Sequence, residues 1–401
     1  MNMKTITRKW PFALILCLSL LLLAPLSSIQ AENSSISTHA RAAALIDVES
    51  GRILYSSRGD EPMLIASLTK IMTALVAIEN GDLASKVKVG KNAYAKEGSS
   101  IYLQQGEEMT LENMLYGLML RSGNDAATAI AEHIGGSEEG FVYLMNAKAE
   151  ELGLTHTHFA NPHGLDAEGH YSSANDLAVL TAYALHNPVF KEIVKTQEKT
   201  ADNPNEKWDY KWRNKNKMLY LYEGADGVKT GYTKKALRCL VSSATRNGQQ
   251  LVAVTINDGD DWNDHASLLN FGFNHYPLKT LIERGDTVTG YNFVTSKTFA
   301  YPLGQGEQNR VITKLVLNQK ESASAEATRA NFGLQGALVL ELGGKEIGRV
   351  PVYTPENLPP EQSAYMKKYS PTLAQAYPAN NWFQALGSAL KALFEMGASS
   401  K

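Results

Sequence analysis

Residues 65–74 read Ile65-Ala66-Ser67-Leu68-Thr69-Lys70-Ile71-Met72-Thr73-Ala74. Apolar side chains recur from Leu68 at helical spacing and Gly81 follows them, so the pattern predicts a helix from Ser67 to about Asn80. A serine hydroxyl is a poor nucleophile unless a base lies beside it. Positions i and i+3 share one face of a helix, so the amine of Lys70 can reach the Ser67 hydroxyl. Burial and nearby positive charge would lower the pKa of that amine until it can accept a proton.

By itself this tetrapeptide is common on helix surfaces, and two later motifs give it weight. The first is Ser122-Gly123-Asn124, which falls in the break between two predicted helices. Ser122 could relay a proton between Lys70 and a leaving group, while Asn124 orients Lys70 and a substrate amide. The alternative is that Ser122 and Asn124 only cap the following helix, a common use of both residue types.

The second later motif is Lys229-Thr230-Gly231, followed directly by Tyr232. Lysine and threonine side chains can bind a carboxylate, and glycine allows close approach of the backbone to a ligand. In this order the three motifs match the signature S-x-x-K, S-D-N and K-T-G of class A β-lactamases and penicillin-binding proteins, with Gly123 in place of the aspartate.

The chain resembles the low-molecular-mass penicillin-binding proteins that act as D-alanyl-D-alanine carboxypeptidases. The resemblance is dense from Ala42 to Tyr276 and thinner towards the carboxyl terminus. Beyond the three motifs it rests on the segments Ile65–Ala74, Leu120–Ala126, Asn161–Asp166 and Asp226–Thr233. The sequence around Lys229 and Asn257–His265 is most similar to carboxypeptidases of endospore-forming Gram-positive bacteria, which suggests a role in spore cortex maturation.

This resemblance implies an α/β (α+β) fold with a β-lactamase/transpeptidase-like domain, in which helices flank a five-stranded antiparallel sheet, followed by a small all-β domain. It implies catalytic roles for four residues: Ser67 as the acylated nucleophile, Lys70 as the base, and Ser122 and Asn124 as cleft partners. It implies substrate binding by Lys229, Thr230, Gly231 and Tyr232. The backbone N–H groups of Ser67 and Tyr232 would form the oxyanion hole.

The implied reaction removes the terminal D-alanine from peptidoglycan stem peptides ending in D-Ala-D-Ala, through an acyl-enzyme and without a cofactor. β-Lactams would act as covalent inhibitors. A D-alanyl endopeptidase and a non-catalytic penicillin-binding wall protein remain alternatives. A β-lactamase is disfavoured, because the Glu-x-x-Leu-Asn motif that supplies its deacylating base is absent between Ser122 and Lys229.

The stretch after the strand that follows the Lys-Thr-Gly strand departs from the family pattern. Relatives often carry an arginine there, whereas Asn257–Trp262 is acidic and contains no arginine. Binding of the substrate carboxylate is therefore expected to rely on Lys229 or on Arg238. The second cation stays unassigned at this point.

Hydrophobic periodicity and turn signals divide the chain into four parts. Residues 1–31 are expected to be a signal peptide, 32–276 the catalytic domain, 277–354 a β-rich domain, and 355–401 a linker with an amphipathic helix. Expected strands are Ala42–Val48, Arg52–Ser56, Leu237–Ala244, Leu251–Ile256, Arg310–Leu317, Ala337–Leu342 and Glu346–Tyr353. Asn247-Gly248 predicts a hairpin between the third and fourth of these, and Gly343-Gly344 predicts one between the last two. Expected helices are Leu111–Leu120 with Thr110 as its cap, Ala126–Ile134, Glu138–Leu152 and Trp262–His275.

Both ends of the chain suggest export and contact with a membrane. Three basic residues precede an apolar run from Phe12 to Leu26 and then small residues, the pattern of a cleaved signal peptide; an uncleaved anchor is the alternative. Apolar side chains recur at helical spacing from Trp382 to Phe394, a stretch suited to the outer face of the cytoplasmic membrane. Packing of that stretch on the β-rich domain is an equal alternative.

Charge and the remaining reactive residue types exclude other classes. The chain has a net charge of −2, and removal of the basic residues 1–31 makes it more acidic, so no nucleic-acid partner is expected. After cleavage Cys239 is the only cysteine, and it is expected to be a core residue. Four histidines lie close in sequence without the spacing of a metal site, so no metal is expected. They are His156, His158, His163 and His170.

Overall fold

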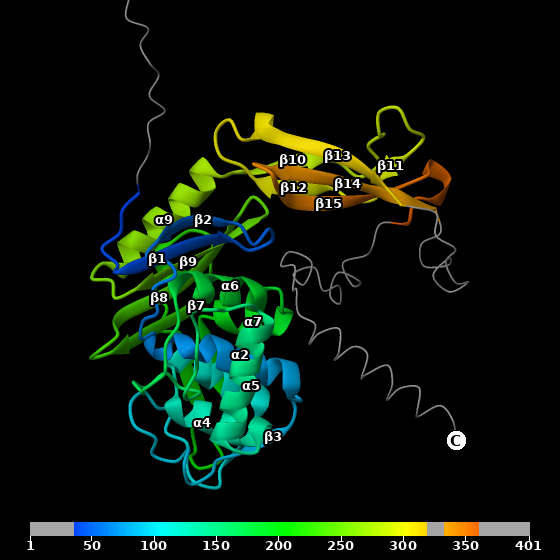
Figure 1. Cartoon of the computed structure of the whole chain (residues 1–401). Coiled ribbons are helices and arrows are strands. Elements are labelled where there is room, and N and C mark those ends of the chain that lie inside the picture. The colour runs from blue at the N-terminus through cyan, green and yellow to red at the C-terminus, as the bar shows by residue number, and fades with distance from the viewer. Residues whose placement is uncertain (1–35, 319–332, 361–401) are drawn as a thin grey trace, which may run out of the picture. The chain divides into compact units, whose positions relative to one another are not determined.

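A computed structural model describes residues 36–318 and 333–360 of the chain (Figure 1). The chain divides into two units, Met1–Ser37 and Thr38–Lys401, and the elements below belong to the second. The expected signal peptide and the amphipathic stretch from Trp382 to Phe394 lie outside the described residues. Among the residues that are described, no helix combines the length and apolar character needed to cross a bilayer.

A five-stranded antiparallel sheet forms the centre of residues 36–276, as the resemblance implied. Its strand order is β2-β1-β9-β8-β7. The strands are β1 (Ala42–Asp47), β2 (Ile53–Ser57), β7 (Ala225–Thr233), β8 (Leu237–Arg246) and β9 (Gln249–Ile256). β7, which carries the Lys-Thr-Gly motif, is an edge strand and therefore has one side free to face other elements.

Helices cover both faces of this sheet. α9 (Asp261–His275) lies along one face and α6 (Ala174–Leu185) along the other (Figure 1). All six residues of β1 are buried, which explains why this strand is uniformly apolar up to Asp47 and does not alternate. The sequence pattern of a strand buried on two faces thus follows from the layer of helix on each side.

The remaining α-helices of this part of the chain lie on the α6 side of the sheet. They are α2 (Lys70–Asn80), α3 (Leu111–Tyr116), α4 (Asn124–Gly135), α5 (Glu138–Glu151), α7 (Pro188–Lys195) and α8 (Met218–Leu221). Two short hairpins accompany them: β3 (Lys86–Lys88) with β4 (Glu108–Thr110), and β5 (Glu198–Ala201) with β6 (Tyr210–Arg213). Thr110 accepts a hydrogen bond from Asn113 N (3.3 Å) and caps α3, as predicted.

Two predicted helices differ from expectation at the ends that reach the site. The helix expected from Ser67 begins as a 3₁₀ turn, η1 (Ala66–Thr69), and becomes α-helical only at Lys70. The helix expected to run to Leu120 changes at Gly117 to a π-helical turn, η2 (Gly117–Arg121). Ala66 and Ser122 have positive φ angles of 47° and 65°, which regular α-helix does not allow. The α-helix therefore starts after Ala66 and stops before Ser122.

A β-rich region follows α9, as expected. β10 (Leu278–Ile282) pairs with β12 (Phe299–Pro302), and a four-stranded antiparallel sheet has the order β11-β15-β14-β13. Its strands are β11 (Val294–Thr295), β13 (Val311–Leu317), β14 (Leu334–Leu342) and β15 (Lys345–Tyr353), with short 3₁₀ turns η3 (Gln308–Arg310) and η4 (Pro355–Asn357) outside them. The predicted hairpin turns at Gly343-Gly344, whose φ angles of 61° and 82° favour glycine.

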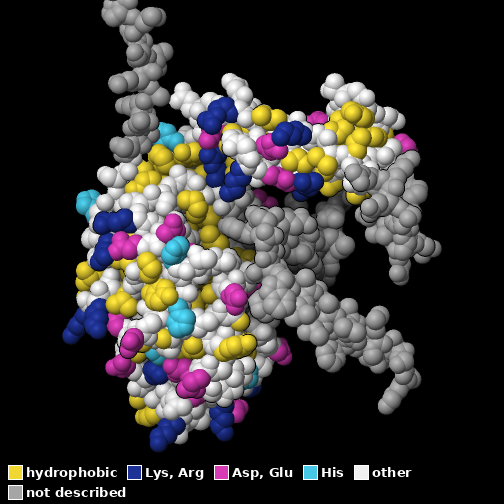
Figure 2. All heavy atoms as spheres, in the orientation of Figure 1, with side chains coloured by type: hydrophobic (Ala, Val, Ile, Leu, Met, Phe, Trp, Pro, Cys, Tyr) yellow, Lys and Arg dark blue, Asp and Glu magenta, His cyan; other side chains and the backbone are white. Residues whose placement is uncertain are grey.

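Charged side chains of both signs are interspersed on the face shown in Figure 2.

Candidate active site

Ser67 lies in the 3₁₀ turn η1, where its neighbours are buried and its own side chain is partly exposed. Thr69 Oγ1 donates to the carbonyl of Ala66 (2.8 Å) and contacts His170 Nε2 (2.7 Å), which fixes the turn from inside. Because Ala160 N donates to His170 Nδ1, the proton of the neutral ring lies on Nε2 and is donated to Thr69. The turn thus presents the Ser67 hydroxyl on a rigid support.

Lys70 is fully buried, and its amine has three oxygen partners. Lys70 Nζ lies 3.1 Å from Ser67 Oγ, 2.7 Å from Asn124 Oδ1 and 2.5 Å from the carbonyl oxygen of His163. Burial lowers the pKa of Lys70 well below its ordinary value, and the positive charges of Lys229 and Lys215 lower it further against the opposing carboxylate of Asp125. The environment therefore favours the neutral amine.

The three partners suit a neutral amine in a specific way. An amide oxygen and a backbone carbonyl can only accept hydrogen bonds, so Asn124 and His163 take the two N–H groups of a neutral Lys70. The third contact joins Lys70 Nζ to Ser67 Oγ at 3.1 Å: an ammonium ion donates across it, whereas a neutral amine directs its lone pair at the Ser67 hydroxyl. This is the arrangement of a base beside a nucleophile.

Asn124 and Ser122 both turn their side chains into the site. Asn124 Nδ2 donates to the carbonyl of Glu97 (2.7 Å), which leaves Oδ1 facing Lys70. Ser122 has a left-handed backbone, and its Oγ accepts a hydrogen bond from Lys229 Nζ (3.1 Å). Gly123 is the N-cap of α4 and the helix has no side-chain cap, so the capping alternative for these two residues is wrong.

Lys229 is buried on β7 and links this strand to the turn before α4. Besides Ser122, its amine donates to the carbonyl of Thr230 (2.7 Å). Burial lowers the pKa of Lys229 to about 7, and the charge of Lys215 contributes. A carboxylate arriving here would restore the charged form, because an opposite charge favours the ammonium ion.

Gly231 brings the backbone of β7 against η1. A Cβ atom built on Gly231 would lie 3.2 Å from Ser67 N and 3.2 Å from the carbonyl oxygen of Ile65, tighter than ordinary packing allows without adjustment. The N–H of Ser67 and the strand beyond Gly231 are therefore close, as an oxyanion hole formed with Tyr232 N requires. The side chain of Tyr232 itself is exposed.

The Asn161–Asp166 segment forms a turn that contacts both the end of β7 and the amine of Lys70. Asp166 accepts a hydrogen bond from Thr233 at the end of β7 (2.8 Å), while the carbonyl of His163 faces Lys70. Gly164 has φ of 85°, and a Cβ there would lie 1.9 Å from the carbonyl oxygen of Ala66, so only glycine fits. Among the described residues no group of three or more His, Cys, Asp or Glu side chains could hold a metal ion.

The two candidate second cations have different surroundings. Arg238 pairs with Tyr232 across β7 and β8, but its guanidinium forms an ion pair with Asp261, with Nε 3.1 Å from Oδ2. Lys215, between β6 and α8, lies near Ser99 Oγ (3.3 Å) and lowers the pKa values of Lys70 and Lys229. Sequence reasoning missed Lys215, because it stands in no recognised motif and reaches the site only through folding.

Comparison with known proteins agrees with this geometry. Residues 28–260 match the Peptidase_S11 family, D-alanyl-D-alanine carboxypeptidase. The D-alanyl-D-alanine carboxypeptidase DacF of Bacillus subtilis (strain 168) is 36% identical over 344 residues, which cover 81% of this chain and 87% of the relative. The crystal structure of penicillin-binding protein 5 from Haemophilus influenzae matches with a TM-score of 0.63 and 27% identity, covering 80% of this chain and 97% of that one. A Streptomyces K15 DD-transpeptidase mutant matches with a TM-score of 0.57 and 32% identity, over 60% of this chain and all of the other. This chain therefore belongs to the Peptidase_S11 family of D-alanyl-D-alanine carboxypeptidases.

Proposed function

We propose that this serine D-alanyl-D-alanine carboxypeptidase forms its acyl-enzyme on Ser67, with Lys70 as the base. The observation that carries the proposal is the Lys70 amine, which is buried, is held by Asn124 Oδ1 and the carbonyl of His163, and lies 3.1 Å from Ser67 Oγ. In its neutral form, which burial favours, this amine can take the Ser67 proton directly.

The acylation step follows from these positions. Ser67 Oγ attacks the carbonyl carbon of the penultimate D-alanine while its proton passes to Lys70 Nζ. Charge on the carbonyl oxygen is stabilised by the N–H groups of Ser67 and Tyr232. The proton then passes to the nitrogen of the terminal D-alanine, directly or through Ser122, and the C–N bond breaks. Water then attacks the ester carbon. One of its protons passes to Ser67 Oγ, so the shortened peptide leaves as a carboxylic acid and the Ser67 hydroxyl is restored.

Lys229 and Thr230 are proposed to bind the terminal carboxylate of the stem peptide. Lys229 is buried, so its charge is weakly screened, and it already contacts Ser122 on the path of the departing D-alanine. We assign Lys215 as the second cation of this end of the site, because Arg238 is occupied by Asp261 whereas Lys215 affects both buried lysines electrostatically.

The test combines two measurements on the purified protein. A fluorescent penicillin should label Ser67, and diacetyl-Lys-D-Ala-D-Ala should release D-alanine. Labelling without release would contradict carboxypeptidase activity and favour the D-alanyl endopeptidase, which a cross-linked dimer substrate would reveal. Neither signal from a folded sample would favour a non-catalytic wall protein.

We propose that residues 1–31 direct export and that the tail holds the enzyme at the outer face of the cytoplasmic membrane. Support comes from the basic and apolar series before Ala31 and the apolar stripe from Trp382 to Phe394. Deletion of Tyr377–Lys401 should move the protein from the membrane to the soluble fraction while activity remains. Retention at the membrane would contradict the role of the tail.

A role in sporulation is a narrower proposal, supported by the similarity around Lys229 and Asn257–His265 and by the Bacillus subtilis relative. Altered cross-linking of the spore cortex in a strain that lacks the protein would support it. An unchanged cortex with altered vegetative wall would oppose it.

A further inference from the structure

The carbonyl oxygen of His163 and Asn124 Oδ1 are the two acceptors that position the Lys70 amine. Residues that fix the position of His163 therefore also affect the position of Lys70. Leu165 N donates to His163 Nδ1 (3.3 Å), which places the proton of the neutral ring on Nε2. That Nε2 is buried and lies 3.4 Å from Glu138 Oε1. The separation is long for a hydrogen bond, so attraction by the carboxylate charge dominates this contact.

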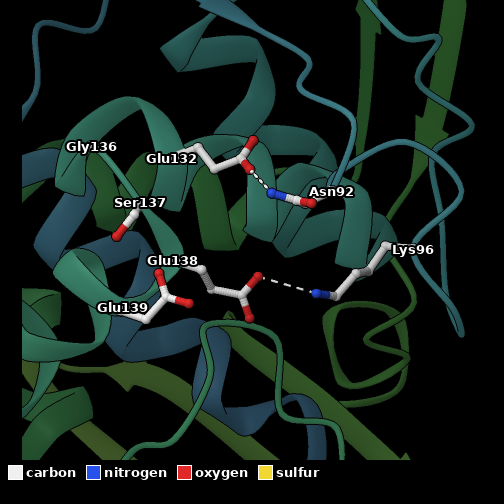
Figure 3. A pocket seen from close by; sticks show the side chains of 7 residues that line it. All are labelled: Asn92, Lys96, Glu132, Gly136, Ser137, Glu138 and Glu139. Atoms are coloured by element: carbon white, nitrogen blue, oxygen red, sulfur yellow. Dashed lines mark hydrogen bonds and ion pairs between the residues drawn. The ribbon is translucent and has the colours of Figure 1, made fainter.

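Glu138 is itself fixed on its other side. It is the first residue of α5, after the capping residue Ser137. Glu138 Oε2 accepts from Lys96 Nζ (3.1 Å), drawn as a dashed line in Figure 3, and from Thr128 Oγ1 (3.3 Å). Contact with His163, followed by that with Lys96, lowers the pKa of Glu138 to about 2, so the carboxylate stays ionised.

The support for Glu138 comes from the helix that carries Asn124. Thr128 lies four residues after Asn124 in α4, so the two side chains share one helix face. One of them contacts Lys70, and the other contacts Glu138. α4 therefore aligns both acceptors of the Lys70 amine, the first directly and the second through Glu138 and His163.

Glu138 also lines a polar pocket of about 600 Å³ (Figure 3). The pocket contains none of Ser67, Lys70 or Lys229, so it is separate from the proposed acylation site. The residues that line it are Asn92, Lys96, Glu132, Gly136, Ser137, Glu138 and Glu139. In Figure 3 the carboxylate of Glu139 lies apart from the contact between Glu138 and Lys96. Glu139 thus provides a matched control, with the same charge in the next position of the same helix.

We propose that Glu138 is a positioning residue of the acylation step: it holds the ring of His163, and so fixes the carbonyl that orients Lys70 towards Ser67. This inference rests on the proposed roles of Ser67 and Lys70. Without the carboxylate, the buried Nε2–H group of His163 loses the oxygen that lies 3.4 Å from it, and no described residue forms a hydrogen bond with it instead. Asn161 Oδ1 still accepts from the backbone N–H of Gly164 (2.7 Å), so the turn is kept. Only the direction of the His163 carbonyl towards Lys70 changes.

The test measures acylation of the full chain by a labelled penicillin, resolved into the binding constant and the acylation rate constant. Glu138→Ala should lower the acylation rate constant about tenfold without weakening binding, because one contact to a reacting amine is lost. Glu138→Gln keeps an oxygen that can accept from His163, so its loss should be smaller, about threefold. Turnover of the D-Ala-D-Ala peptide should likewise show a lower kcat with an unchanged KM.

Glu139→Ala is the control and should acylate at the wild-type rate. Thermal unfolding of each variant shows whether it is folded; if Glu138→Ala is not, Glu138→Gln alone decides. A folded variant of Glu138 with a wild-type acylation rate constant would overturn the proposal, as would a change in binding alone or an equal loss in Glu139→Ala. A wild-type protein that penicillin does not label would instead refute the proposed function itself.

Discussion

The five-stranded sheet buries a basic side chain on each of its faces, yet only one face is arranged for chemistry. Lys229 pairs with Val241 across β7 and β8, and Val241 belongs to the core shared with α2 and α4. The next residue, Ser242, points to the other face and contacts His265 Nδ1 (2.6 Å) on α9. Both basic groups have lowered pKa values.

The difference between these faces lies in the neighbours. His265 is bracketed by two hydroxyls, Ser242 Oγ and Thr255 Oγ1, and burial alone lowers its pKa to about 3. Lys70 lies 3.1 Å from the partly exposed Ser67, and both Lys70 and Lys229 are influenced by a further cation, Lys215. A shifted pKa therefore does not identify an active site; a shifted base beside an accessible nucleophile does.

The largest effect is expected from Ser67→Ala on the catalytic face. Without the hydroxyl no acyl-enzyme can form, so penicillin labelling and D-alanine release should fall by about 10⁴-fold or more. Mass spectrometry of the labelled protein gives the direct measurement. Normal labelling of this variant would show that another residue is the nucleophile.

Lys229→Ala should have the next largest effect, because it removes the buried charge that is proposed to bind the substrate carboxylate. We expect kcat/KM for a D-Ala-D-Ala peptide to fall about 10²-fold, mainly through KM. A substrate whose terminal carboxylate is converted to an amide should lose much less. An equal loss on both substrates would contradict carboxylate binding.

The pH dependence of kcat/KM should distinguish the two lysines. Lys70 must be neutral to accept the Ser67 proton, so activity rises with pH until Lys70 has lost its proton. Lys229 must be charged to fulfil its proposed role in carboxylate binding, and its pKa of about 7 places the midpoint of the falling limb near pH 7. Substrate raises that pKa, so the falling limb of kcat should lie at higher pH. A falling limb that remains in Lys229→Ala would exclude this assignment.

The smallest effect on activity is expected from His265→Gln on the α9 face, within about twofold of wild type because no reacting group is touched. Stability should respond instead. The native pKa of His265 is about 3 and the ordinary value is 6.5, so between these values the unfolded state binds more protons and stability falls as pH falls. The substitution should remove a slope of up to about 1.4 kcal/mol per pH unit, measured by urea unfolding at pH 4 to 7. An unchanged slope would show that His265 does not titrate on unfolding.

Local patterns predicted most of the helices and strands of the described residues. The strands around Asn247-Gly248, the cap at Thr110 and the hairpin at Gly343-Gly344 all appear as predicted, because turn geometry and capping depend on adjacent residues. The 3₁₀ start at Ala66 was not predicted, since the positive φ of an alanine there is imposed by packing against Gly164 and β7. Lys215 and Glu138 were missed as well, because neither belongs to a motif.

The sequence by itself determined the reactive groups: Ser67 with Lys70 three residues later, Ser122-Gly123-Asn124, and Lys229-Thr230-Gly231, in an order that specifies the family. Only the tertiary structure decided the lowered pKa of Lys70 and the orientation of its amine towards Ser67. Its acceptors come from Asn124 and His163, which lie 54 and 93 residues away, so α4 and the turn that carries His163 must be assembled around it. Desolvation and hydrogen bonding across such separations exist only once the chain has folded, so no local pattern encodes them.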